Sequence, residues 1–500
     1  MKILSPIQLK EADNYTIEHE PISSIDLMER AATKCFEWFI EKYNSDETVA
    51  VFCGIGNNGG DGLALSRMLI DAGWKVNTYV VEFSNNYSLD FTINYKRLEV
   101  LSPIKHLVDN DTIPEIVEDV VVDAIFGVGL SKPPRDFTKD LIEKINKSNA
   151  KVVSIDMPSG LYANEKVSDF NSIIKAQYTL TFQSVKLSLL LPEYSDYSGE
   201  FVILDIGLLS NYFENIDVRS HYTEMVDILK ILKRRKKFSH KGTYGHSLLV
   251  GGSSGKMGAI LMATKAAVKS GSGLVTSLIP KCGYQILQTA VPEAMVLIEG
   301  NNNLESLHHN INPSAIGIGP GLGMVVGTTE LLKRFFNGND TPLVIDADAL
   351  NLMSSHRDLL AMLPEGSVLT PHPKEFERLV GKWNDDFDKL KLATEFAINY
   401  QIVLVLKGAN TAIFTPEGNI YFNSTGNSAL ATGGSGDVLT GIITSLISQG
   451  YSNIDASILG VYLHGLTAEI AIDLGNESLE SFSATNIIDY LGRAFNTLKN

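Results

Sequence analysis

The sequence predicts an α/β fold in two domains, each with a mostly parallel sheet between two layers of helices. Two observations predict it. Continuous apolar strand segments alternate with helical patterns, and this alternation stops and then restarts near residues 220–240. Strands that are apolar on both faces are typical of parallel sheets covered by helices. At 500 residues the chain also exceeds one ordinary core. We therefore expect three-layer α/β/α domains over residues 1–222 and 223–500.

The elements of the first domain follow from local patterns. Ser5-Pro6-Ile7-Gln8 predicts a capping box that opens a helix, and an apolar stripe predicts a second helix over about 24–43. The next helix is expected over 61–72, ended by Gly73. Apolar runs predict strands over 48–53, 75–81, 120–126, 151–155, 178–182 and 201–204.

The second domain repeats the alternation after a basic run at residues 233–237, which is either a solvated linker or faces an anionic ligand. A helix is expected over 259–270, closed by Gly271. Apolar runs predict strands over 246–250, 274–279, 316–318, 343–345, 368–370 and 402–406. Polar loops follow several of these strands, and open α/β sheets bind ligands at that edge.

Composition excludes several function classes. The net charge of -16 argues against a general nucleic-acid or membrane-surface binder, which needs a basic face. Three scattered cysteines suit neither a disulfide framework nor a zinc site. The first residues lack signal-peptide architecture, and no apolar run reaches the roughly 20 residues that span a bilayer. We expect a cytoplasmic homo-oligomer that binds neither nucleic acid nor membranes.

A Gly-rich loop with an acid, residues 54–62, follows the first strand. The N–H groups at the start of a helix suit a phosphate, although a tight structural turn is the alternative. The loop departs from the dinucleotide fingerprint because its acid, Asp61, comes at once instead of about twenty residues later. Asp123, Asp156 and Ser159 stand at the ends of later strands. Their oxygens, with those of the loop asparagines, are hard ligands for a group I or II cation.

These motifs together resemble the NAD(P)H-hydrate epimerase (YjeF N-terminal) family, a Rossmann-like domain, over about residues 1–220. The resemblance implies K⁺ near Asn58, Asp123 and Ser159, and a nicotinamide beside Asp156. The family interconverts the C6 epimers of hydrated NADH or NADPH. A strand-end carboxylate can move a proton, but the residues leave open whether Asp156 does so or binds ribose. The resemblance further implies that phosphates and ribose lie on Asn57, Asn58, Gly59, Gly60, Asp61, Gly127, Val128, Gly129, Leu130, Ser131, Lys132 and Pro133.

A second Gly-rich loop, residues 431–437, precedes a run of apolar residues at helical spacing. The N–H groups of Gly434, Ser435 and Gly436 suit an anion hole for a transferring phosphoryl group. Asp437 then stands where it can take a proton from an attacking hydroxyl, unless it only caps the helix.

This loop resembles the ribokinase-like superfamily, and residues 240–500 resemble the ADP- or ATP-dependent NAD(P)H-hydrate dehydratase family. The further matching motifs are Gly251-Gly252-Ser253, residues 319–323, 346–351, 370–375 and 407–411. The implied chemistry is phosphorylation of the C6 hydroxyl and then loss of phosphate, with Mg²⁺ accompanying ADP or ATP. The family pattern implies that the hydrated nucleotide contacts Ala259, Gly321 or Gly323, His372 and Asp437, and that the adenine nucleotide contacts Lys407, Gly408, Ala409, Asn410, Thr411 and Gly436.

Residues beyond the loop leave alternatives open. His372 stands between two prolines at a strand end, which favours a site residue over a core histidine. Asp346 and Asp348 either bind Mg²⁺ through water, or Asp348 caps the following helix. His464, within an apolar helix, is expected in the core or at an interface. Glu375 is either a supporting group behind the site or an acid in the first turn of a helix.

Three functional hypotheses follow. The leading one is a bifunctional repair enzyme in which one domain supplies the epimer that the other consumes. The second is a vitamin or sugar kinase with an N-terminal regulatory nucleotide-binding module. The third makes the N-terminal domain a binding scaffold without catalysis. The sequence does not decide between ADP and ATP, or between hydrated NADH and hydrated NADPH.

Overall fold

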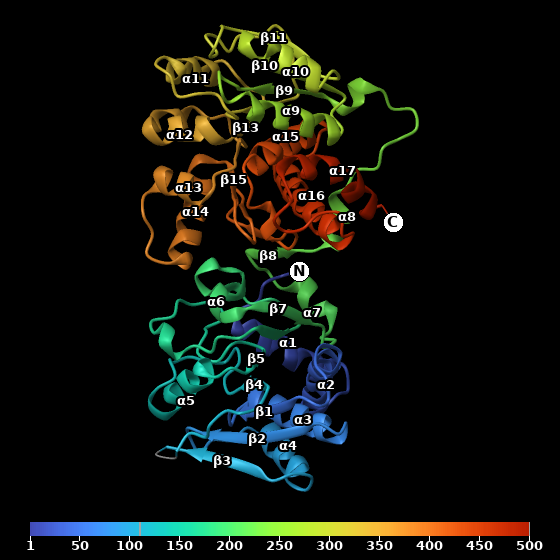
Figure 1. Cartoon of the computed structure of the whole chain (residues 1–500), viewed down its shortest axis with the longest axis vertical. Coiled ribbons are helices and arrows are strands. Elements are labelled where there is room, and N and C mark those ends of the chain that lie inside the picture. Colours follow the sequence, from blue (N-terminus) through green and yellow to red (C-terminus); the bar gives the residue numbers. More distant parts are fainter. Residues whose placement is uncertain (110–111, 500) are drawn as a thin grey trace. The chain divides into compact units, whose positions relative to one another are not determined.

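A computed structural model describes residues 1–109 and 112–499, and it divides into two compact units (Figure 1). One unit comprises Lys2–Val218 with Asp385–Phe387, and the other comprises Met1, Arg219–Asn384 and Asp388–Asn500. Each unit has one sheet between helices, so the predicted three-layer α/β/α class is confirmed.

The N-terminal sheet has seven strands in the order β3-β2-β1-β4-β5-β6-β7, and all its pairs are parallel. The chain order reverses between β1 and β4, and ligands bind at such a switch point. The strands are β1 (Thr48–Cys53), β2 (Lys75–Glu82), β3 (Ile104–Val108), β4 (Val120–Ala124), β5 (Lys151–Ile155), β6 (Tyr178–Phe182) and β7 (Glu200–Leu204). The helices are α1 (Pro6–His19), α2 (Ser24–Lys42), α3 (Asn57–Asp71), α4 (Leu89–Glu99), α5 (Asp136–Lys147), α6 (Ser195–Ser198) and α7 (Ser210–Asn215).

Strand β1 shows why this sheet is buried on both faces. Its residues alternate between two apolar clusters, because successive side chains of a strand point to opposite faces. Val49, Val51 and Cys53 pack with α2, α3 and α4. Ala50 and Phe52 pack with α5 on the other face. A strand at this position therefore has to be apolar on both of its faces.

The C-terminal sheet has ten strands in the order β11-β10-β9-β12-β13-β14-β15-β16-β17-β8. Its pairs are parallel except β15 with β16 and β16 with β17. The strands are β8 (Ser220–Thr223), β9 (His246–Val250), β10 (Leu274–Ile279), β11 (Met295–Ile298), β12 (Ala315–Ile318), β13 (Leu343–Ile345), β14 (Val368–Leu369), β15 (Val403–Leu406), β16 (Ala412–Phe414) and β17 (Ile420–Asn423). The helices are α8 (Met225–Ile231), α9 (Met257–Lys269), α10 (Tyr284–Ala290), α11 (Thr328–Asn337), α12 (Ala347–Ser355), α13 (Pro373–Val380), α14 (Asp386–Tyr400), α15 (Ser435–Ser448), α16 (Asn453–Asp473) and α17 (Ala484–Thr497).

The predicted helices and strands are present, but α3 and α9 start earlier than predicted. The capping box of Ser5 and Gln8 is confirmed. Helix α3 begins at Asn57, not at Asp61, so Gly59 and Gly60 lie inside its first turn. A Cβ atom on Gly59 would lie 1.7 Å from the carbonyl oxygen of Gly54. Glycine at this position therefore lets the helix start directly against the end of β1.

The basic run at residues 233–237 binds the ends of two helices. Lys233 Nζ donates to the carbonyl oxygen of Gly450 at 2.5 Å, just after α15. Arg235 donates to the carbonyl oxygen of Gly271, just after α9, and its guanidinium lies 3.9 Å from the ring centre of Tyr244. Cations are favourable at helix C-termini because the exposed carbonyl groups there carry partial negative charge. These two side chains thus anchor the linker on the second unit.

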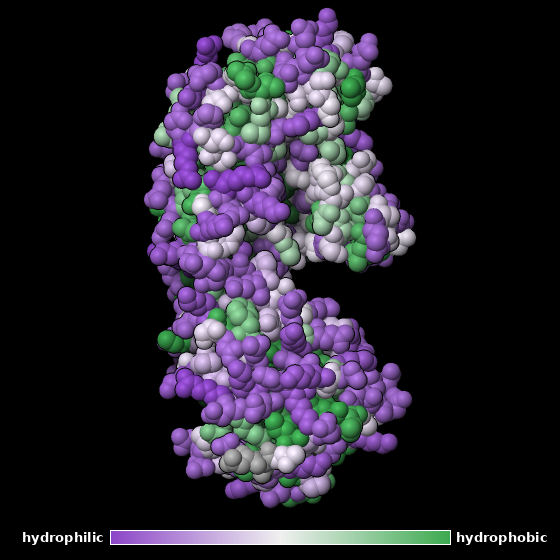
Figure 2. All heavy atoms as spheres, turned by 60° about the vertical axis from the view of Figure 1, so that its left-hand side comes forward, coloured by the Kyte–Doolittle hydropathy of each residue, from purple (hydrophilic) through white to green (hydrophobic). Residues whose placement is uncertain are grey.

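Within the described ranges, no helix combines the length and the apolar character that crossing a membrane requires. Figure 2 shows a mainly hydrophilic face on each unit, with apolar side chains gathered in small patches.

Candidate active sites

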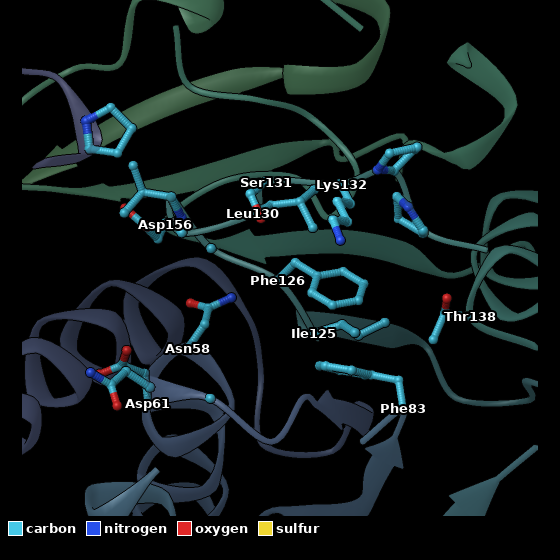
Figure 3. Close-up of a pocket in the computed structure, with 18 of the residues that line it drawn as sticks. Asn58, Asp61, Phe83, Ile125, Phe126, Leu130, Ser131, Lys132, Thr138 and Asp156 are labelled. Carbon is cyan, nitrogen blue, oxygen red and sulfur yellow. Dashed lines mark hydrogen bonds between the residues drawn. The ribbon is translucent and has the colours of Figure 1, made fainter. Parts of the chain in front are cut away.

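A cavity of about 910 Å³ lies in the N-terminal unit, at the carboxyl edge of its sheet (Figure 3). It is lined from α1 and from the residues that follow β1, β2, β3, β4 and β5. Most of the predicted N-terminal site residues reach it: Asn57, Asn58, Asp61, Gly127, Val128, Gly129, Leu130, Ser131, Lys132, Pro133 and Asp156. Gly59 and Gly60 are buried in the first turn of α3, and Asp123 and Ser159 are buried residues outside the lining.

Asp123 is a fully buried carboxylate that joins two strand ends. Ser159 donates to it through its hydroxyl at 2.5 Å and through its backbone N–H at 2.8 Å. The Ser154 hydroxyl on β5 donates at 2.8 Å. Burial raises the pKa of Asp123, and the bonds from Ser159 and Ser154 oppose that rise because they favour the charged form.

Asn58 lines the cavity with a buried amide that lacks a hydrogen-bond partner among the described residues. Both its amide oxygen and its amide nitrogen are buried, and neither has a hydrogen-bond partner among the described residues. An unsatisfied buried polar group costs about 1–3 kcal/mol, so such a group points to a ligand that satisfies it. A Cβ atom on Gly127 would lie 3.2 Å from the amide carbon of Asn58 and 3.0 Å from Asp156 Oδ2. Asn58 and Asp156 therefore converge on the Gly127 backbone.

Asp156 follows β5 in a left-handed conformation, with φ of 65°. Such a backbone is strained for a residue other than glycine and is concentrated at functional sites. Its Oδ2 accepts from the Val128 N–H at 2.8 Å, and its Oδ1 accepts from Lys186 Nζ at 2.6 Å. The Lys186 side chain is buried and also donates to the Thr181 hydroxyl at 2.8 Å. The sequence interpretation missed Lys186. The feature that could have indicated it is a single charged residue directly before the mainly apolar segment 187–191.

Two of the other carboxyl groups that line the cavity, those of Asp61 and Asp13, have raised pKa values. Burial is the main cause for Asp61, followed by the negative charges of Asp156 and Asp13, and the rise is large. For Asp13 on α1, burial and then the charge of Asp156 raise the pKa to about 6, against the opposing effect of Lys186. Carboxyl groups held partly protonated beside an ion pair are characteristic of proton-transfer sites. The sequence interpretation missed Asp13, because only the folding of α1 over the sheet edge brings it there.

The second site gathers at the N-terminus of α15. A Cβ atom on Gly436 would lie 3.1 Å from Lys407 Nζ and 3.5 Å from Asp346 Oδ2. Lys407 Nζ donates to Asp346 Oδ1 at 2.9 Å, and the Thr440 hydroxyl donates to Asp346 Oδ2 at 2.8 Å. Glu375 Oε2 lies 4.0 Å from Lys407 Nζ. Lys407 is thus held where the predicted nucleotide loop, Lys407 to Thr411, meets the helix.

Asp437 lies in the first turn of α15, and its pKa is raised to about 7. Burial is the main cause and the charge of Asp346 the next, while Lys407 opposes both. The N-cap of α15 is Gly434, and Asp437 is the third residue of the helix, so Asp437 does not serve as its N-cap. A carboxylate that titrates near neutral pH is suited to take up a proton at the operating pH.

The other predicted residues of this unit fall around the same helix end. Gly321 lies against Ala259, because its Cβ position is 3.3 Å from that side chain. Asp348 accepts from the Gly323 N–H at 2.9 Å and from Lys256 Nζ at 3.0 Å. The alternative in which Asp348 caps the helix is therefore wrong, because that helix, α12, begins after Asp346 and Asp348 points to another loop.

The predicted loop histidine and the helical histidine differ in environment. His372 caps α13, because its Nδ1 accepts from the Lys374 N–H at 3.1 Å, and nearly half of its side chain stays exposed. Glu375 completes this capping box, because its Oε2 accepts from the His372 N–H at 2.9 Å. His464 is buried, and burial lowers its pKa to about 4. It bonds to Ser435 at the start of α15, so His464 is a neutral core group beneath the site.

Within the nucleotide loop, the Thr411 hydroxyl donates to the Gly408 carbonyl oxygen at 2.9 Å and closes a turn over Ala409 and Asn410.

Two α/β domains, each with buried carboxyl groups at the carboxyl edge of a parallel or mostly parallel sheet, define a two-site α/β enzyme. The family described as "YjeF-related protein N-terminus" matches residues 24–188, and the family described as "NAD(P)H-hydrate dehydratase" matches residues 247–493. The order of the two families along the chain is the predicted one.

Relatives match nearly the whole chain. The "Bifunctional NAD(P)H-hydrate repair enzyme Nnr" of Moorella thermoacetica is 34% identical, covering 98% of this chain and 96% of the relative. The enzyme of the same name from Thermofilum pendens is 31% identical, covering 100% and 97%. A solved ADP/ATP-dependent NAD(P)H-hydrate dehydratase from Bacillus subtilis, co-crystallised with ATP and Mg²⁺, is 32% identical over 56% of this chain and 98% of its own, with a TM-score of 0.49. The chain belongs to the family of bifunctional NAD(P)H-hydrate repair enzymes.

Proposed function

We propose that this chain repairs hydrated nicotinamide nucleotides at both of its sites. The N-terminal domain interconverts the C6 epimers of hydrated NADH or NADPH, and the C-terminal domain dehydrates the S epimer at the expense of ADP or ATP. The observation that carries the proposal is the similarity to bifunctional repair enzymes over 98% of the chain. This full-length match favours the repair function over a vitamin or sugar kinase with a regulatory module, and over a scaffold without catalysis.

At the N-terminal site we propose that carboxyl groups move protons at C6. Inverting this carbon requires its C–O bond to break and to form again on the other face. The leaving hydroxyl then accepts a proton, and the water that adds gives one up. Asp156, paired with Lys186 Nζ at 2.6 Å, is our candidate base. The raised pKa values of Asp13 and Asp61 support one of these as the acid. The loops at 57–61 and 127–133 are our candidates for holding the phosphates and ribose.

We also propose K⁺ at Asn58, Asp123 and Ser159. The donor set fits, because the buried Asn58 amide has no partner among the described residues and oxygen donors suit a weakly charged cation. Asp123 already accepts hydrogen bonds from Ser154 and Ser159, which fix the position of its carboxylate. It would therefore supply a fixed negative charge beside the ion. A K⁺ ion bound there would give positive charge close to the phosphate-binding loop.

The K⁺ proposal predicts a stability change that needs no turnover. We expect KCl to raise the unfolding temperature of the N-terminal transition by a few degrees over an equal concentration of NaCl, because a bound ion stabilises the folded state by mass action. Asn58→Leu should lose this difference, and Asn171→Leu, on an exposed turn, should keep it. The proposal is wrong if wild type and Asn58→Leu respond alike.

At the C-terminal site we propose a phosphoryl transfer followed by elimination. Asp437 takes the proton of the C6 hydroxyl as that oxygen attacks the terminal phosphoryl group of ADP or ATP. The N–H groups of Gly434, Ser435 and Gly436 and the cation of Lys407 stabilise the transferring group. Phosphate then leaves C6, C5 gives up a proton to water, and the double bond between C5 and C6 forms. Mg²⁺ would bind with the nucleotide near Asp346 and Asp348, whose oxygens are hard ligands. We place the hydrated nucleotide against Ala259, Gly321, Gly323 and His372.

The proposal is tested by giving purified protein a mixture of hydrated NADH epimers, with and without ADP or ATP. We expect absorbance at the reduced-nicotinamide band to rise only when ADP or ATP is present. The amount of NADH formed should exceed the amount of S epimer initially present, because the N-terminal site converts the R epimer into the S epimer. Inorganic phosphate should appear in equal amount. Accumulation of a phosphorylated product without phosphate release would instead indicate a kinase.

We further propose that the two domains are separable. The predicted boundary between residues 222 and 223 would cut β8, which pairs with β17 in the C-terminal sheet. Fragments 1–218 and 219–500 should each fold and keep one activity. A fragment 223–500 should unfold at a lower temperature than 219–500, because β17 becomes an exposed edge strand. If neither 1–218 nor 219–500 were soluble while the full chain was, separability would be wrong.

A further inference from the structure

The N-terminal cavity extends past the predicted substrate loops to the end of β2. Glu82, the last residue of β2, and Phe83 line it together with Asp109, which follows β3. In Figure 3, Asn58, Asp61 and Asp156 stand toward one side of the cavity, and Phe83, Ile125 and Phe126 toward the other. The second side has no role in the proton transfer proposed above.

Sheet order explains how one ligand can reach both sides. Strands β2, β1, β4 and β5 are consecutive neighbours, so β2 and β5 are three strand spacings apart, about 14 Å. The start of α3 lies between them, after β1. In the doubly wound dinucleotide folds, the pyrophosphate sits at this helix start, and an acid about 20 residues further on binds the ribose of the adenosine. Glu82 comes 26 residues after Gly56 and ends the strand next to β1.

The Glu82 carboxylate is held in place. His106 on β3 contacts Glu82 Oε1 through its Nδ1 at 2.5 Å, and the Tyr95 hydroxyl lies 2.9 Å from the other ring nitrogen of His106. The Glu82 side chain is 22% exposed, so it is positioned by protein contacts yet open to the cavity. Beside it, the rings of Phe83 and Phe126 lie 4.8 Å apart between centres at 43°. Such a pair offers an aromatic face to a flat base.

We infer that the end of β2 is the adenosine subsite of this cavity, and that Glu82 there accepts hydrogen bonds from the ribose hydroxyls and disfavours a 2′-phosphate. The N-terminal site then prefers hydrated NADH to hydrated NADPH. This inference rests on the proposed epimerase function and adds its substrate preference. Phe83 and Phe126 contact the adenine, and Asp109 adds negative charge at the same end of the cavity. The cations of Lys132 and Arg135 come from the loop after β4, and they face the pyrophosphate.

The test measures epimerisation of both substrates by the full chain without ADP or ATP, so that dehydration does not drain either epimer. The epimer ratio is followed by chromatography. We expect wild type to favour hydrated NADH by about tenfold in kcat/KM, mainly through KM, because like charges in contact are costly. Glu82→Gln should raise the KM for hydrated NADH, lower the KM for hydrated NADPH, and reduce the preference at least about fivefold.

The control is Glu41→Gln, which removes the same charge from an exposed position of α2 outside the cavity lining. It should leave the preference unchanged. Phe83→Ala should raise both KM values alike. A wild type that prefers hydrated NADPH overturns the inference and assigns Lys132 or Arg135 to the 2′-phosphate. Equal use of both substrates, or a Glu82→Gln variant with an unchanged ratio, also overturns it. No epimerisation of either substrate would instead contradict the proposed function itself.

Discussion

Replacing Asp437 by Asn is expected to lower the nucleotide-dependent dehydration rate by about 10²–10⁴-fold, the usual loss on removal of a general base. The amide keeps the size of the side chain and cannot take the proton of the C6 hydroxyl. Epimerisation in the same protein should be unaffected, because its candidate residues lie in the other unit. The measurement is the rate of absorbance increase at the reduced-nicotinamide band with saturating ATP, beside the epimer exchange rate without nucleotide.

The matched control is Asp455→Asn, because Asp455 is the third residue of α16 as Asp437 is of α15. It should retain full dehydration. An Asp437→Asn variant with more than half of the wild-type rate would contradict the general-base role.

The raised pKa of Asp437 adds a pH dependence with a definite sign. Because the folded pKa is about 7 and above its ordinary value, the folded state holds this proton at pH values where the unfolded chain has lost it. The stabilisation is complete at low pH and is lost as pH rises through about 7. Wild type should therefore lose thermal stability relative to Asp437→Asn between about pH 4 and pH 8. Dehydration by wild type should increase over the upper part of this range, as the base becomes ionised.

Replacing Asp156 by Asn is expected to lower the saturated epimerisation rate by about 10²–10⁴-fold with substrate affinity largely kept. The amide preserves shape and can still accept from the Val128 N–H, which now bonds at 2.8 Å. It cannot take a proton from the water that adds at C6, and it leaves the buried Lys186 cation without its carboxylate partner. Dehydration of purified S epimer should continue at the wild-type rate.

Affinity and rate separate the two roles of Asp156. If this carboxylate only held the ribose, the Asn variant would bind substrate more weakly and keep its saturated rate, and the catalytic assignment would be wrong. Asp140→Asn, on the exposed face of α5, provides the control for loss of one carboxylate in the same domain. Equal unfolding temperatures of the two variants would show that the rate loss is not a folding defect.

The sequence by itself determined the class and the strand ends. Residues 48–53 and 151–155 are continuously apolar, and that pattern is stable only where helices cover both faces of a sheet. The loops with Asp61 and Asp156 stand out because glycine and acids follow such strands directly, and Asp437 stands out within a glycine-rich helix start. These motifs depend only on residues that are close together in the sequence, so the sequence alone is enough to predict them. The start of α3 was harder to predict, because Gly60 and Gly62 in its first turns fit against Met28 and Ala124, and these are tertiary contacts.

Only the tertiary structure decided which distant residues join those loops. Asp13 reaches the cavity because α1 folds over the sheet edge, and Lys186 reaches Asp156 because β5 and β6 are neighbours. Glu82 becomes a candidate ribose ligand only once β2 is placed beside β1. The raised pKa of Asp437 needs both burial and the carboxylate of Asp346, which is 91 residues earlier. Strand order, burial and charge pairing across long separations are collective results of packing, and no local pattern encodes them.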